Sequence, residues 1–353
     1  MSGTSERPIR RRGRLWWAAY YAAAALLAFA IGEFAARWRI EGGVLAALAS
    51  VVGRRGPWAG SADAPLVPHG ELGYVLNPTL PGVNSLGFRG PEVEPGPHPG
   101  IERLLVLGDS IAYGEGSFPD GLRDRLARGN GAVEVLNASV PGYTTHQERL
   151  FFERRLAPLA SDRVLLQYCL NDHHRFLHHI AADGRRLLSP EARRGPPGKD
   201  PGWFSFLAQR SYLLTEARRR LHLRRVAASS RGPWETRKDI APAWRDESWP
   251  TFAAELAALR DAVGAKAGRL LVAAFPIEEQ LHPARLVSDR EETLKPQREL
   301  ARVCADVGLP LIDLFEDFRA AAERGERLFR DGIHLTEAGH ALAAEALAAR
   351  LPR

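Results

Sequence analysis

The 353-residue sequence has only two cysteines, Cys169 and Cys304, and only four lysines among its 48 basic residues. Two cysteines exclude a disulfide framework and a cysteine-based zinc site, although a single bridge between them stays open. The net charge of +6 is concentrated at the start of the chain, because residues 1–14 carry +4 and the rest carries about +2. A nucleic-acid-binding protein would carry a basic field over its folded part, so nucleic acid is excluded as a partner.

Charged residues are absent from positions 15–32, directly after five arginines. This stretch spans roughly 27 Å as a helix, close to the thickness of a bilayer core, and the preceding arginines favour a cytoplasmic N-terminus. We expect a cytoplasmic basic tail over 1–14 and a transmembrane signal anchor over 15–32, which places the rest of the chain in the periplasm beside the inner membrane. Two alternatives stay open. Ala28-Phe29-Ala30 resembles a signal-peptidase site, which would give a secreted protein, and the stretch would also suit a buried alanine-rich helix.

The remainder divides into a stalk or linker over 33–100, which wraps the domain, and a regular part over 101–353. Short apolar runs in the regular part predict five strands, at 103–107, 133–137, 163–168, 269–275 and 309–314. Amphipathic stretches between most of these runs predict helices, at 121–128, 146–156, 252–263 and 297–307. Apolar strands that alternate with helices indicate an α/β fold with a five-stranded parallel sheet covered on both faces.

About 95 residues separate the third and fourth predicted strands, far more than one crossover helix needs. We expect an insertion at about 175–250, at the mouth of the sheet. Its tryptophans would either contact sugar rings and acyl chains or fill a small core of the insertion: Trp203, Trp234, Trp244 and Trp249. Four histidines at its start predict a solvated or substrate-facing cluster rather than a metal site: His173, His174, His178 and His179.

Residues suited to catalysis follow the ends of the predicted strands. Ser110 follows the first strand, Gly142 the second and Asn171 the third, and Asp331 and His334 follow the fifth. Ligands bind at the carboxyl ends of the strands in such sheets, so we expect these residues to meet there.

The residue types fit acyl chemistry. A serine hydroxyl becomes a nucleophile when a base such as His334 takes its proton, and Asp331 would orient that imidazole. The backbone N–H groups of Ser110 and Gly142 and the amide of Asn171 would stabilise the negative charge that develops on a carbonyl oxygen.

These blocks resemble the SGNH/GDSL hydrolases, over about residues 101–353 without the insertion. The resemblance rests on Gly108-Asp109-Ser110, Gly142, Asn171-Asp172 and Asp331-Gly332-Ile333-His334. It implies a flavodoxin-like three-layer α/β/α sandwich, a catalytic triad of Ser110, His334 and Asp331, and an oxyanion hole from Ser110, Gly142 and Asn171. One departure is Cys169, where the third block often has glycine.

The predicted function is that of a membrane-anchored serine esterase that hydrolyses an O-acetyl or lipid acyl ester outside the cytoplasm, without a cofactor or metal. Its partners would be the membrane and a lipid or acetylated glycan substrate. Two other functions stay open: an O-acyltransferase that modifies an envelope glycan with the same site, and a non-catalytic binding protein on the hydrolase fold.

Overall fold

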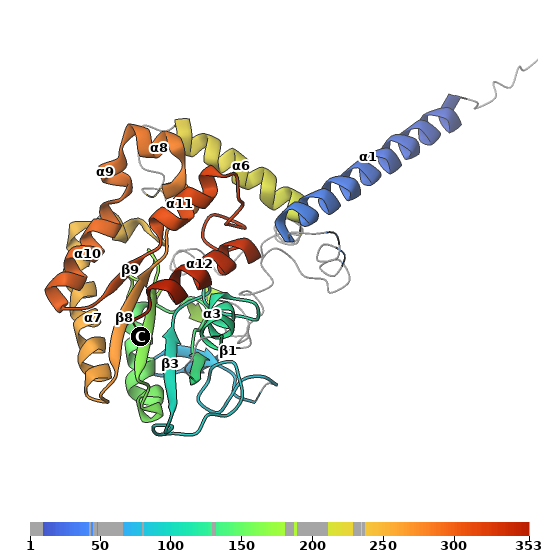
Figure 1. Cartoon of the computed structure of the whole chain (residues 1–353). Coiled ribbons are helices and arrows are strands. Elements are labelled where there is room, and N and C mark those ends of the chain that lie inside the picture. The colour runs from blue at the N-terminus through green and yellow to red at the C-terminus, as the bar shows by residue number, and fades with distance from the viewer. Residues whose placement is uncertain are drawn as a thin grey trace, which may run out of the picture.

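The computed structural model describes residues 10–41, 44, 48, 66–79, 81–128, 132–180, 187–188, 211–228, 234 and 237–352. A rounded body of strands and helices carries one long helix that projects away from it (Figure 1). The strands are β1 (Leu66–His69), β2 (Gly73–Leu76), β3 (Ile101–Leu107), β4 (Ala132–Asn137), β5 (Arg163–Tyr168), β6 (His179–Ile180), β7 (Leu187–Leu188), β8 (Arg269–Ala274) and β9 (Leu311–Asp313). The helices are α1 (Arg10–Glu41), α3 (Phe118–Leu126), α4 (Thr145–Phe151), α6 (Tyr212–Ala228), α7 (Trp249–Gly264), α8 (Pro283–Ser288), α9 (Arg290–Thr293), α10 (Lys295–Val307), α11 (Phe315–Glu323) and α12 (Glu337–Arg350).

The main sheet has five parallel strands in the order β4-β3-β5-β8-β9. Its middle strands are mostly buried and mostly apolar, as expected for a parallel sheet that is covered on both faces. The prediction of a five-stranded parallel α/β sheet is therefore confirmed. The order also creates a switch point at β3. Strand β4 lies on one side of β3 and β5 on the other, so the connections from β3 to β4 and from β4 to β5 run in opposite directions across the sheet. Ligand crevices form at such points, beyond the carboxyl ends of the strands.

Helices cover both faces of this sheet, which gives the three predicted layers. Alternate residues of β3 point to opposite faces: Leu105 and Leu107 belong to one apolar core, and Leu104 and Val106 belong to the other. The first core includes buried residues of α4, α7 and α10, and the second includes residues of α3, α11 and α12.

The described part of the segment expected to be a stalk or linker, from residue 66 on, is integral to the domain. Strands β1 and β2 form an antiparallel hairpin, and Leu72 and Tyr74 are completely buried in the first core. Farther along, Phe88 is buried in the same core, and the Asn84 side chain accepts a hydrogen bond from the Phe88 N–H and donates one to the Pro91 carbonyl. Residues 66–90 thus add to the core and do not merely pass over its surface.

The insertion between β5 and β8 is folded where the structure describes it. Trp234 and Trp244 are buried and stack in parallel, with ring centroids 4.3 Å apart, and Trp249 is buried as well. These three tryptophans therefore fill a core, which is one of the two expected roles, whereas Trp203 lies outside the described residues. Both cysteines, Cys169 and Cys304, are buried free thiols, so the single bridge that the sequence left open is absent.

Helix α1 continues without a break from Arg10 to Glu41. Its stretch Trp16–Arg39 is long and apolar enough to cross a membrane, and residues 16–31 of it are all exposed. This exposure excludes the alternative of a buried alanine-rich helix, and it is compatible with a membrane anchor or a signal sequence.

Candidate active site

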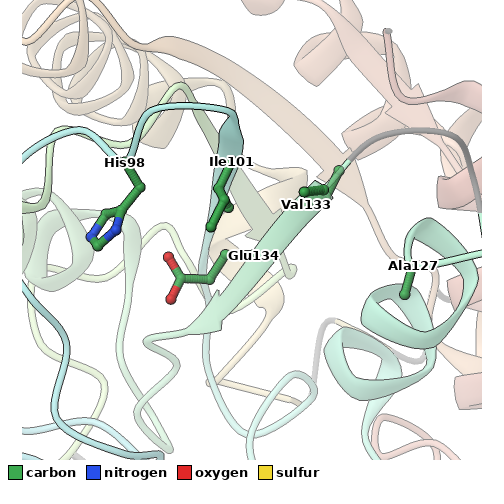
Figure 2. Close-up of a pocket in the computed structure, with 6 residues that line it drawn as sticks. His98, Ile101, Ala127, Val133 and Glu134 are labelled. Atoms are coloured by element: carbon green, nitrogen blue, oxygen red, sulfur yellow. The ribbon is translucent and has the colours of Figure 1, made fainter.

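The amino ends and the carboxyl ends of the strands in the main sheet present different groups to a ligand. A hollow of about 400 Å³ lies at the amino ends of β3 and β4, beside Ile101 and Ala132, with His98 and Glu134 on its rim (Figure 2). The residues singled out from the sequence follow the opposite, carboxyl ends of the strands. The hollow is therefore not the expected site.

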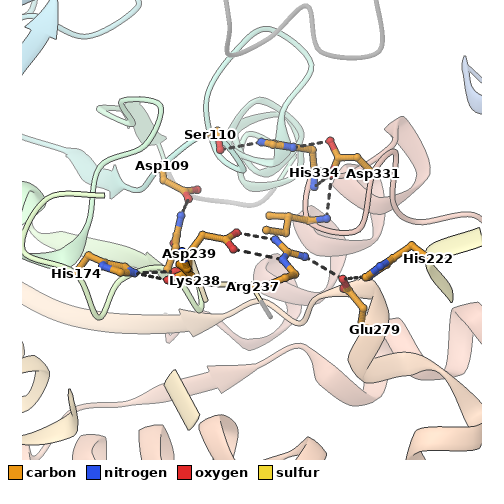
Figure 3. Close-up of polar contacts among 12 residues, drawn as sticks. Asp109, Ser110, His174, His222, Arg237, Lys238, Asp239, Glu279, Asp331 and His334 are labelled. Atoms are coloured by element: carbon orange, nitrogen blue, oxygen red, sulfur yellow. Dashed lines mark hydrogen bonds and ion pairs between the residues drawn. The ribbon is translucent and has the colours of Figure 1, made fainter. Parts of the chain in front are cut away.

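Three of the predicted residues meet beyond the carboxyl end of β3. The Nε2 atom of His334 lies 2.9 Å from Oγ of Ser110, and its Nδ1 atom lies 2.7 Å from Oδ2 of Asp331. Figure 3 shows the three side chains in one row, with the imidazole between the hydroxyl and the carboxylate. With Nδ1–H donating to Asp331, Nε2 can accept the serine proton, which is the arrangement that activates a serine.

The short spacing between Asp331 and His334 is explained by a tight turn. Oδ1 of Asp331 accepts the N–H groups of Ile333 and His334 at 3.0 and 2.9 Å, while Oδ2 meets the imidazole. Gly332 has a φ of +108°, a backbone conformation that favours glycine. The Arg330 N–H donates to the His334 carbonyl at 2.7 Å and closes the turn. Both carboxylate oxygens are thus occupied, and the acid is held in one orientation.

Electrostatics couples the acid and the base. Burial would lower the pKa of His334, but the Asp331 carboxylate and its hydrogen bond outweigh burial and raise that pKa. Burial would likewise raise the pKa of Asp331, but the imidazole and the turn N–H groups lower it. The carboxylate therefore stays ionised, and the imidazole binds a proton more strongly than a free one does.

Asn171 is brought to the same place by Asp109. The Asn171 Nδ2 group donates to Oδ2 of Asp109 at 3.0 Å, and Oδ1 of Asp109 accepts the Ile111 N–H at 2.9 Å. Asp109 thus links the loop after β5 to the turn that carries Ser110. Only one of the two amide hydrogens of Asn171 is needed for this bond, so the other remains to donate to an oxyanion.

Gly142 lies in the loop after β4. That loop is tied to the serine turn, because the Val140 N–H donates to the Gly108 carbonyl at 3.0 Å. At position 142 φ is +74°, and a Cβ there would lie 2.4 Å from the His178 ring and 2.9 Å from the Tyr74 hydroxyl. Only glycine fits this backbone and this space.

Two polar residues beneath the site were missed from the sequence. The Gln167 side chain on β5 accepts the Asp109 N–H at 3.1 Å, and a Cβ on Gly108 would lie 2.6 Å from the same Gln167 oxygen. Gln167 was recognisable as one amide within an otherwise apolar strand run. Glu148 on α4 is the second, and burial together with Asp172 raises its pKa well above the usual range.

Of the four histidines expected to form a solvated or substrate-facing cluster, His173 instead contacts protein groups through both ring nitrogens. Its ring packs against Trp249 and Phe252, and its nitrogens lie 2.8 Å from the Tyr168 hydroxyl and 3.0 Å from Oγ of Ser248. Burial lowers its pKa to about 3. In the part of the chain that the structure describes, no group of three or more histidine, cysteine or acidic side chains is arranged to hold a metal ion.

Several solved structures are similar to this chain at low sequence identity. No curated protein matches the chain. An acetyl xylan esterase structure is 14% identical, with a TM-score of 0.42, and the match covers 71% of this chain and 100% of that one. The lipase/acylhydrolase from Enterococcus faecalis is 17% identical, with a TM-score of 0.41 and coverage of 71% and 97%. A catalytic mutant of an acetylxylan esterase from Geobacillus stearothermophilus is 13% identical, with a TM-score of 0.43 and coverage of 70% and 92%.

A family assignment comes from the sequence comparison. Residues 106–342 match the GDSL-like lipase/acylhydrolase family, and this range includes Ser110, Asp331 and His334. Because the match spans more than half of the chain, the resemblance found in the sequence is confirmed, and the chain belongs to the GDSL-like lipase/acylhydrolase family.

Proposed function

We propose that the protein is a serine esterase with Ser110 as nucleophile, His334 as base and Asp331 as the group that orients the base. The observation that carries this proposal is the continuous row of hydrogen bonds, 2.9 Å from serine to histidine and 2.7 Å from histidine to aspartate. Family membership supports ester hydrolysis as the reaction class.

The reaction follows from the positions of the atoms. His334 Nε2 takes the proton of the Ser110 hydroxyl while Oγ attacks the ester carbonyl carbon. The resulting oxyanion would accept hydrogen bonds from the backbone N–H groups of Ser110 and Gly142 and from the amide of Asn171. The protonated His334 then gives its proton to the leaving alcohol. Water, deprotonated by the same imidazole, hydrolyses the acyl-serine and restores the enzyme.

We further infer that α1 anchors the enzyme in a membrane and that the ester is an O-acetyl or lipid acyl ester outside the cytoplasm. The exposed apolar stretch of α1 supports the anchor. The arginines that precede the apolar stretch support an N-terminus in the cytoplasm. The catalytic domain would then face the periplasm and act on lipids or on acetylated envelope glycans.

The triad assignment is tested by replacing the nucleophile. Ser110→Ala should abolish hydrolysis of p-nitrophenyl acetate by the full-length protein in detergent, and it should also abolish stoichiometric labelling by a fluorophosphonate probe, because only an activated serine reacts. Ser117→Ala is the matched control, since the Ser117 hydroxyl only donates to the Gly114 carbonyl. Undiminished turnover in Ser110→Ala would refute the assignment, and turnover that requires an added glycan acceptor would indicate acyl transfer instead of hydrolysis.

The anchor assignment is tested in cells. The full-length protein should stay in the membrane pellet after an alkaline carbonate wash, and protease added to spheroplasts should digest its catalytic domain, because the apolar helix spans the bilayer with its N-terminus inside. A soluble periplasmic product that lacks residues 1–30 would show a cleaved signal peptide, and protection from protease would refute the orientation.

A further inference from the structure

Glu33, in the last third of α1, caps helix α6 of the insertion. One carboxylate oxygen of Glu33 accepts the Tyr212 N–H at 2.9 Å, and the other accepts the Leu213 N–H at 3.0 Å and the Ser211 hydroxyl at 2.7 Å. Oγ of Ser211 in turn accepts the Leu214 N–H at 3.1 Å. The first N–H groups of a helix have no partner within that helix, and a negative charge is favourable there. Glu33 therefore completes α6 from a segment almost 180 residues earlier in the chain.

Side-chain packing supports the same contact. Arg37 donates to Glu33 at 3.0 Å, and its guanidinium lies over the Tyr212 ring, 4.5 Å from the centroid. Ala36 and Tyr212 are buried against each other, and a Cβ on Gly32 would lie 3.0 Å from a Leu213 methyl group. Figure 1 shows the two helices meeting at this point, from which α6 continues across the body of the protein.

Helix α6 reaches the catalytic turn by a first route through Glu216. This carboxylate is buried and lies 2.6 Å from a guanidinium nitrogen of Arg327. Arg327 donates in addition to the backbone carbonyls of Phe329 and Arg330, at 3.1 and 3.4 Å. Those carbonyls directly precede Asp331, so α6 holds the segment through which the chain enters the turn.

A second route passes through the loop after β8. Arg219 of α6 pairs with the Glu278 carboxylate, and the Glu278 N–H donates to the Gly332 carbonyl at 2.8 Å. One turn farther along α6, His222 lies 2.9 Å from the Glu279 carboxylate. Figure 3 shows the pair of His222 and Glu279 beneath the row of Ser110, His334 and Asp331. Both routes therefore end on the backbone of residues 329–332.

We propose that Glu33, in the last third of helix α1, is a positioning residue for the Asp331–His334 turn and acts on it through α6. The proposal rests on the proposed esterase function, because it assigns to the anchor a role in that reaction. Without the Glu33 carboxylate, the start of α6 loses the three hydrogen bonds that Glu33 accepts. Arg37, which donates to Glu33 and packs on Tyr212, is then no longer held in place. The interactions of Glu216 with Arg327, of Arg219 with Glu278 and of His222 with Glu279 then weaken. The hydrogen bond between Asp331 and His334 weakens with them.

The test uses the full-length protein in lipid nanodiscs, with p-nitrophenyl acetate as substrate. Glu33→Ala should lower kcat about tenfold with little change in KM, because misplaced catalytic groups cost rate and not ground-state binding. The acid limb of its pH profile should also move to lower pH, since a looser Asp331 raises the pKa of His334 less. Glu33→Gln keeps one acceptor oxygen and should recover part of the rate. Arg39→Ala, an exposed residue near the same end of α1, is the control and should behave as wild type.

Hydrogen–deuterium exchange gives a readout that does not depend on turnover. In Glu33→Ala, exchange should rise in residues 211–216 and in 329–335 but not in strand β5. Faster exchange confined to 211–216, or a wild-type kcat and pH profile in Glu33→Ala, would overturn the proposal. The esterase proposal would survive either result as long as the fluorophosphonate still labels Ser110. If wild type neither turns over the ester nor reacts with the probe, the esterase proposal fails instead, and exchange alone then decides whether Glu33 holds the turn.

Discussion

The imidazole of His334 lies in an environment where two influences oppose each other. Burial disfavours its charged form, whereas the Asp331 carboxylate 2.7 Å away favours it, and the second influence is stronger. Because the base must be neutral to accept the serine proton, activity should be lost as the pH falls through the raised pKa of His334. The acid limb of kcat/KM should therefore lie above pH 6.5, the ordinary pKa of histidine.

Asp331→Asn should change both the acid limb of the pH profile and the rate constant kcat. The amide cannot stabilise the imidazolium, so the main influence that raises the pKa of His334 is lost and the acid limb moves to lower pH. The rate constant kcat should fall by about 10³- to 10⁴-fold, because the imidazole loses its correct tautomer. A pH series of kcat/KM on the variant and wild type measures both effects. An acid limb that stays in place would show that another group titrates.

The proposed oxyanion role of Asn171 leads to a separate prediction. Asn171→Ala removes one donor and should lower kcat about 10²- to 10³-fold with little change in KM. Asn77→Ala is a matched control, because the Asn77 side chain only accepts hydrogen bonds from Thr79 in an exposed turn. Steady-state kinetics on both variants measures the difference, and an unchanged kcat in Asn171→Ala would remove this residue from the oxyanion hole.

At the residue scale, the sequence was informative for residues that directly follow a predicted strand. It was less informative for contacts between residues that are distant in the chain. Ser110, Gly142, Asn171, Asp331 and His334 were predicted as site residues because each follows a predicted strand. The contact between Gln167 and Asp109 joins β5 to the β3 turn, and no local pattern encodes it. His173 was misread for the same reason, since its partners Trp249 and Phe252 are more than 70 residues away.

Among the elements, the hairpin β1–β2 and the following loop contribute to stability. Phe88 is buried in the first core with 1% of its surface exposed, so Phe88→Ala should lower the free energy of unfolding by about 3–5 kcal/mol. Val287→Ala on α8 is the control, because that side chain is 88% exposed. Urea denaturation of both variants measures the effect. A small loss for Phe88→Ala would mean that residues 66–90 are dispensable for the core.

The five strands of the main sheet were predictable because each is a short continuous apolar run, and β5 was found with its bounds as observed. The hairpin β1–β2 was not, because its strands have only four residues each and the surrounding proline and glycine are typical of a linker. Helix α6 was missed because its arginines hide any apolar face. Its stability comes from the Glu33 cap and from acidic partners elsewhere in the chain, which periodicity does not reveal.

For the whole molecule, the strand order places Ser110 at the switch point, and the long connection from β5 to β8 supplies α6 beside it. The parallel sheet therefore accounts for where the proposed catalytic residues lie, and helix α6 of the insertion connects α1 to the turn that carries Asp331 and His334. The sequence predicted the anchor and the domain as separate parts joined by a linker. The contact between α1 and α6 could not be predicted from the sequence, because Glu33 and Leu213 are 180 residues apart.

The position of Glu33 has a consequence for proteolytic release. The peptide bond after Ala30, within the sequence that resembles a signal-peptidase site, lies on the N-terminal side of Gly32, Glu33 and Arg37. A cut at that bond would remove the apolar stretch and leave the whole α6 contact on the shed fragment. A released form and a tethered form of this enzyme would then share one intact catalytic domain and differ only in how far they diffuse from the bilayer.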